Sequence, residues 1–69
     1  MINDKTFTAA EKLKCAEREL KQRYRVYARL VAQNKITQRQ ADHEIALMED
    51  IAADYRALIE TMERSERLL

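Results

Sequence analysis

The sequence predicts an all-α fold, a two-helix antiparallel hairpin that dimerises into a four-helix bundle. Three observations support this prediction. The 69-residue chain contains no glycine and no proline, and helix-forming residues dominate its composition. Apolar residues recur at steps of three and four along two segments. The two halves are oppositely charged, with nine Lys or Arg against four Asp or Glu over residues 1–36, and four against eight over residues 37–69. Opposite charges suit two helices that lie side by side.

The first helix is expected over about residues 8–33. Thr8 and Glu11 match the capping box, in which the two side chains each satisfy a free backbone N–H at the start of a helix. One face of this helix then carries a regular apolar series: Ala9, Leu13, Ala16, Leu20, Tyr24, Tyr27 and Val31. The opposite face carries a row of cations that we call the basic stripe: Lys14, Arg18, Lys21, Arg25 and Arg29.

A turn is expected at residues 34–36, inside the segment VAQNKITQRQADHEI. Asn34 is the residue best able, after glycine, to adopt the left-handed conformation that ends many helices. Thr37 and Gln40 form a second capping box, and Ile36 precedes it as a hydrophobic staple. A continuous helix would place polar residues in its own apolar stripe here, so the pattern favours a turn.

The second helix is expected over about residues 37–66, which completes a single domain spanning residues 1–69. Its main apolar series has a heptad spacing: Ala41, Ile45, Met48, Ala52, Tyr55, Ile59 and Met62. A second apolar row lies beside it, and the combined face is too wide for one partner helix. The sequence therefore predicts a homodimer interface: Leu47, Ile51, Tyr55, Leu58 and Met62.

Size and composition also favour self-association. A chain this short forms one domain with a small core, and such domains usually need a disulfide, a metal or a partner. Cys15 is the single cysteine, so no intrachain disulfide is possible. The N-terminus has no apolar signal segment, and no apolar run is long enough to span a membrane. We therefore expect a cytoplasmic protein without a membrane partner.

No constellation of residues predicts catalysis, so the chain is expected not to be an enzyme and to use no cofactor, metal or small-molecule substrate. His43, the only histidine, has Ala46 and Leu47 where a helical metal site would need ligands. We expect it to be a solvated surface residue or part of a contact. Cys15 is expected to be a small, partly buried side chain. The roles of both residues stay open.

One stretch resembles a known group of proteins. Residues 11–58, EKLKCAERELKQRYRVYARLVAQNKITQRQADHEIALMEDIAADYRAL, resemble small helical proteins of proteobacterial phages and prophages that have no assigned activity. The likeness lies in RELKQRYRVYARLVA, in ITQRQADHEIALM and in the later DY. Members of that group tend to have glycine at the place of Asn34. The resemblance implies an accessory phage protein, and such proteins often bind a host protein.

The leading hypothesis is therefore a phage or prophage protein that binds and inhibits or modulates a host defence or regulatory protein through the basic stripe. Nucleic acid is the alternative partner for the same stripe, because Lys and Arg contact phosphates. Nearby acidic residues and a net charge of only +1 make it the weaker alternative. A purely self-assembling structural module is the third possibility.

Overall fold

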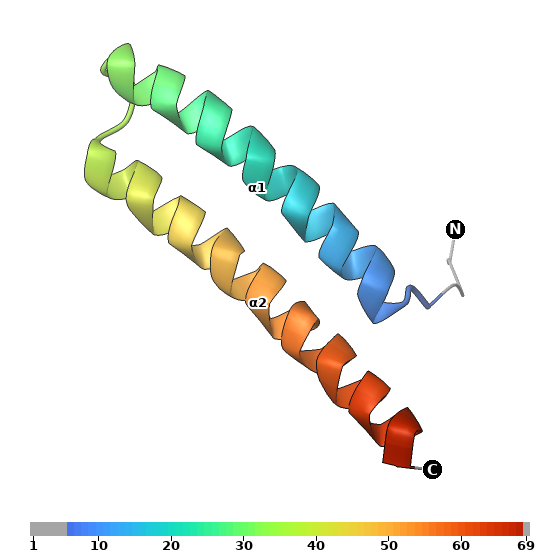
Figure 1. Ribbon diagram of the computed structural model, residues 1–69. Helices are drawn as coiled ribbons and strands as arrows, with labels where there is room; N and C mark the ends of the chain where they lie inside the picture. Colours follow the sequence, from blue (N-terminus) through green and yellow to red (C-terminus); the bar gives the residue numbers. More distant parts are fainter. Residues whose placement is uncertain (1–5, 69) are drawn as a thin grey trace.

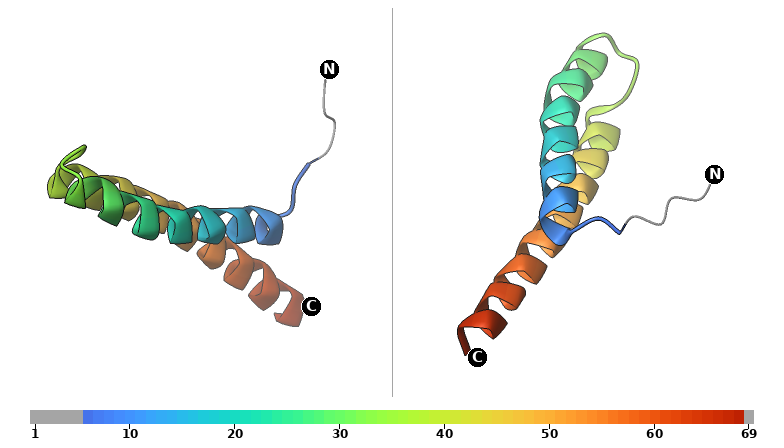
Figure 2. Two further views of the ribbon diagram at one scale, coloured as in Figure 1. Left: turned by 90° about the horizontal axis from the view of Figure 1, so that it is seen from above. Right: turned by 90° about the vertical axis from the view of Figure 1, so that its right-hand side faces the viewer.

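The computed structural model describes residues 6–68, and these form two antiparallel α-helices joined by a short turn (Figure 1). Helix α1 spans Ala9–Ala32 and helix α2 spans Gln38–Leu68. The predicted all-α helical hairpin is thus confirmed. The ends of the expected 1–69 domain, residues 1–5 and 69, lie outside the described residues. Two side-by-side helices form one layer, and the molecule measures 53 × 34 × 14 Å (Figure 2).

Helix α1 begins with the predicted capping box. The Thr8 Oγ1 accepts a hydrogen bond from the Glu11 N–H, and the Glu11 Oε1 accepts one from the Thr8 N–H, both at 3.0 Å. These contacts satisfy two backbone donors that a helix leaves free at its start. Hydrogen bonding to Thr8 lowers the pKa of the Glu11 carboxyl, because those bonds favour the ionised form.

The turn contains the left-handed residue that the sequence predicts. Asn34 has a φ of 58°, and no other described residue has a positive φ. Its N–H donates to the Val31 carbonyl at 3.0 Å, and the Lys35 N–H donates to the Leu30 carbonyl at 2.9 Å. This pair of bonds is the Schellman motif, which satisfies carbonyls at the end of a helix. The motif stops α1 without a glycine.

Replacing Asn34 tests this geometry. We expect Asn34→Gly to be as stable as the wild type or slightly more stable, because glycine adopts a positive φ without a steric cost. Asn34→Ala is expected to lose about 1 kcal/mol, since alanine lacks the short polar side chain that lets asparagine adopt the left-handed conformation. Urea unfolding followed by circular dichroism measures both. A glycine variant less stable than the alanine variant would show that residue 34 is helical in solution.

Helix α2 begins with the second predicted capping box. The Gln40 N–H donates to the Thr37 Oγ1 at 3.0 Å, and the Thr37 N–H donates to the Gln40 Oε1 at 2.9 Å. The helix then runs to Leu68, two residues past the expected end. Its last turns carry strong helix formers such as Glu63, Arg64 and Arg67 with no breaker among them, which accounts for the extension.

Alanines bring the two helices into contact. The residues buried within the described chain are all alanines: Ala16 of α1, and Ala41 and Ala52 of α2. Ala41 and Ala52 are only 1% exposed, and no large side chain is fully buried. Larger apolar residues such as Leu20 and Ile45 flank this line and are partly buried. The hairpin alone therefore has a very small core.

The helices differ in length, with 24 residues in α1 and 31 in α2. The last turns of α2 consequently extend beyond the start of α1 (Figures 1 and 2). Within residues 6–68, neither helix is apolar enough over a sufficient length to cross a membrane.

Candidate interaction surfaces

The basic stripe lies along the outer face of α1. All five of its side chains are exposed: Lys14, Arg18, Lys21, Arg25 and Arg29. None of them forms an ion pair with another residue in the part of the chain that the structure describes. From Lys14 to Arg29 the stripe runs about 22 Å, at 1.5 Å per residue. It is a straight row of free cations on a rigid element.

Among the described residues, no acidic residue of α1 forms an ion pair with this row. The Glu11 carboxylate is occupied by the capping box with Thr8. The Glu17 carboxylate accepts a hydrogen bond from Arg56 of α2 at 3.1 Å. Glu19 lies on a different side of α1, where it lines a groove with Ile51. Of these three carboxylates, only that of Glu17 is thus paired with a cation from outside the stripe, whereas Glu11 keeps its negative charge.

Polar contacts join the helices along one side of their contact line, which we call the polar edge. The Tyr24 hydroxyl donates to the Glu49 carboxylate at 2.6 Å, and Arg56 pairs with Glu17 two turns farther along. Tyr24, a member of the predicted apolar series of α1, is 47% exposed. Its ring spans the edge so that the hydroxyl reaches a partner on α2.

The Tyr24–Glu49 contact predicts a pH effect. Hydrogen bonding to the Glu49 carboxylate raises the pKa of Tyr24, with burial and the negative charge adding to the shift. A pKa raised on folding gives stability that is present below the unfolded pKa and is lost as pH rises through the folded value. We expect the Tm difference between wild type and Tyr24→Phe to shrink in thermal scans at increasing pH above about 10. Tyr27→Phe is the matched control, since no hydrogen bond from its hydroxyl is present within residues 6–68. A Tm difference that is independent of pH would contradict the contact.

The predicted dimer residues lie on the opposite side of the contact line, which we call the apolar edge. Leu47, Ile51, Leu58 and Met62 are 49%, 36%, 47% and 53% exposed. Tyr55, the fifth predicted residue, is partly buried, and the Lys12 Nζ lies 5.8 Å from its ring centroid. At 100° per residue these five positions share one 80° sector of α2. The structure thus places them together on one face.

The apolar edge continues onto α1 as a groove of about 260 Å³. Ile51 and Tyr55 form one wall of it, and Cys15 and Ala16 form the other. Cys15 was expected to be partly buried, but it is exposed, because α2 does not extend over that side of α1. The groove is open to the solvent, and most of the residues that line it are apolar.

Sequence reasoning missed Arg23. The Arg23 guanidinium donates to the Glu44 backbone carbonyl at 3.0 Å and to the Glu44 Oε1 at 3.3 Å. The same group lies 5.9 Å from the ring centroid of Tyr27. Arg23 is thus not part of the outer face but links the two helices beside the apolar edge. A signal was present, because steps of three and four from Leu20 lead to residue 23 as well as to residue 24.

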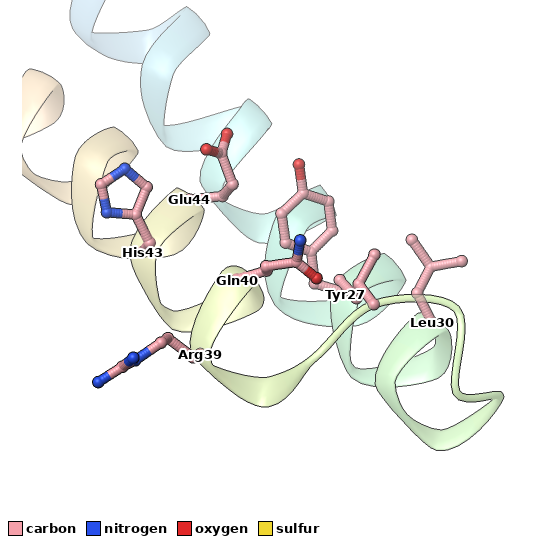
Figure 3. Close-up of a pocket in the computed structure, with 7 residues that line it drawn as sticks. Tyr27, Leu30, Arg39, Gln40, His43 and Glu44 are labelled. Carbon is pink, nitrogen blue, oxygen red and sulfur yellow. The ribbon is translucent and has the colours of Figure 1, made fainter.

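A pocket of about 420 Å³ lies at the end of the hairpin near the turn, and we call it the turn-end pocket (Figure 3). It is lined by Tyr27, Leu30, Ile36, Arg39, Gln40, His43 and Glu44. Tyr27 and Leu30 provide its apolar side, whereas the Arg39 side chain points away from Tyr27 (Figure 3). His43 is exposed at the rim, and no cluster of metal-ligating residues occurs among residues 6–68.

Comparison of the chain with protein-family models, with curated proteins and with solved structures gave no match.

Proposed function

We propose that this chain is a non-enzymatic protein that acts by protein–protein interaction, as a homodimeric four-helix bundle that binds another protein through the basic stripe. One observation carries the proposal above the others. Within residues 6–68, five cations stand exposed in a row on one helix without an ion-pair partner, while the Glu11 and Glu17 carboxylates beside them bond to other groups. Unpaired cations in a fixed row favour a surface with complementary negative charge.

The size of the exposed surface supports the dimer. The chain exposes 6011 Å², whereas a compact monomer of this mass exposes about 4,500 Å². The excess of roughly 1,500 Å² is larger than the approximately 800 Å² per partner of a standard interface. The apolar edge is the face that would be covered, because a carboxylate–tyrosine contact and an ion pair already cross the polar edge.

The proposed partner is an acidic surface of a bacterial host protein, with a defence or regulatory role. The resemblance of residues 11–58 to phage and prophage proteins favours a host partner. In the proposed dimer the stripe stays available, since it lies on the side of α1 away from α2. Rim charges of this kind mainly accelerate association and select the partner.

Affinity capture from a bacterial lysate treated with nuclease tests the proposal. We expect one host protein to be retained by the wild type and lost with Lys21→Glu/Arg25→Glu, which reverses the centre of the stripe. Lys35→Glu/Arg64→Glu is the matched control, because it removes two exposed cations that lie off the stripe. Equal retention by both variants would contradict the role of the stripe. Capture of nothing by the wild type would instead favour a purely structural module.

Nucleic acid is the second candidate, favoured by the same free cations. Neutralising about five phosphates would make log K fall with log salt at a slope of about −4.5. The acidic residues of α2, among them Asp50 and Asp54, would repel a second stretch of backbone. Fluorescence anisotropy with labelled RNA and DNA at 50 and 200 mM salt separates the two candidates, because nuclease-sensitive and steeply salt-dependent binding would replace the protein-partner proposal.

A further inference from the structure

We infer that the dimer is antiparallel about Ile51, with Met62 of each copy seated in the turn-end pocket of the other copy. This inference rests on the homodimer of the proposed function and specifies its arrangement. The occupant of the apolar edge is thus a second copy of this chain. Three observations support it: the spacing of the apolar-edge residues on α2, the unequal lengths of the two helices, and the position of the turn-end pocket.

The positions of α2 that form and extend the apolar edge are spaced symmetrically about Ile51. Leu47 and Tyr55 lie four residues to either side of Ile51, and Gln40 and Met62 lie eleven residues to either side. All of these positions fall within the same sector of α2 at 100° per residue. An antiparallel copy therefore places Leu47 against Tyr55 and Gln40 against Met62, each pair twice. A two-fold interface requires this kind of self-complementarity.

The turn-end pocket provides what Met62 lacks. Met62 is 53% exposed, so its own chain covers only about half of it. In the antiparallel arrangement Met62 lies next to Gln40 of the other copy, and Gln40 lines the pocket together with Tyr27 and Leu30. Methionine is unbranched and flexible, and its sulfur packs well against aromatic rings. A half-exposed apolar side chain thus meets a pocket with an apolar side.

Charge and length agree with the same arrangement. Glu44, which faces Leu58, is already paired with Arg23, which reduces the cost of covering its carboxylate. The last turns of α2 would lie over the turn of the other copy. In a parallel arrangement the two extending ends would lie together without α1 beneath them.

Disulfide cross-linking tests the arrangement. In a Cys15→Ser background, we expect oxidised Gln40→Cys/Met62→Cys to run predominantly as a covalent dimer on a non-reducing gel. Gln40→Cys alone and Met62→Cys alone are expected to stay uncross-linked, and Gln40→Cys/Ala57→Cys is the matched control on the outer face. The Gln40 N–H bond to Thr37 remains in these variants, because it uses the backbone. Cross-linking of either single variant would overturn the antiparallel arrangement.

A distance measurement between the two copies tests the arrangement without substituting any residue of the turn-end pocket. Spin labels at Ser65→Cys, an exposed position on the last turns of α2, would be about 42 Å apart in the antiparallel dimer, at 1.5 Å per residue over 28 residues. Double electron–electron resonance distances below about 20 Å would indicate a parallel dimer and overturn the inference. Sedimentation equilibrium of the same samples separates the two failures, because a monomer overturns the homodimer itself, whereas a dimer with a short distance overturns only its orientation.

Discussion

Ile51→Glu is expected to dissociate the protein and lower its helix content. The substitution places a carboxylate at the centre of the proposed dimer interface, where it would meet its symmetry copy without a cation. The lost burial of two isoleucines amounts to at least about 3 kcal/mol per dimer. That free energy corresponds to a dissociation constant more than 100-fold higher. Sedimentation equilibrium and far-ultraviolet circular dichroism at a series of concentrations measure both changes.

Ala57→Glu is the matched control for this substitution. It adds the same charge to the same helix, but on the outer face, which the proposed interface leaves free. Alanine and glutamate also have similar helix propensities. We expect the control to keep the mass and helix content of the wild type. A wild type that is monomeric at micromolar concentration, or an Ile51→Glu variant that stays dimeric, would contradict the interface.

Ala52→Leu is expected to destabilise the hairpin itself. Ala52 is 1% exposed, so its methyl group is covered on all sides by neighbouring atoms. A leucine there adds three carbon atoms to a contact that has no free space, and overpacking of this kind costs about 1–3 kcal/mol. Because the buried residues among those that the structure describes are three alanines, this cost is a large fraction of the total stability. Urea unfolding and thermal scans by circular dichroism measure the loss.

Ala53→Leu provides the comparison, because Ala53 is the next residue on the same helix and is exposed. It introduces the same side chain without placing it between the helices, so we expect a change within about 0.5 kcal/mol. Equal destabilisation by both substitutions would mean that the alanine contact does not hold the helices together. A stabilised Ala52→Leu would mean that the helices are farther apart in solution than in the structure.

The helices and the turn follow from local patterns, which is why the sequence predicts them. The capping boxes at Thr8 and Thr37 and the left-handed Asn34 involve contacts within three to five residues. Contacts of this range depend little on the rest of the molecule. The absence of glycine and proline did not obscure the turn, because asparagine can occupy the same backbone conformation.

The contacts between the helices could not be predicted in the same way. Whether residue 23 or 24 faces α2 depends on the rotation of α1, in which Ala16 is the buried residue. The sequence pattern therefore assigned the inner position to Tyr24, whereas the structure gives the interhelical contact with Glu44 to Arg23. The same rotation exposes Cys15. Register between two helices is a property of their packing, and a periodicity in one helix does not determine it.

The short connection between the helices makes formation of the hairpin fast compared with association of two chains. Residues 33–37 join α1 to α2, so the first interhelical contacts close a loop of about ten residues, which takes on the order of 10–100 ns. The chain has no proline, so prolyl isomerisation cannot add a slow phase. Hairpin formation is thus expected to be fast and independent of concentration. Any slower refolding phase whose rate rises with protein concentration then reports the meeting of two chains.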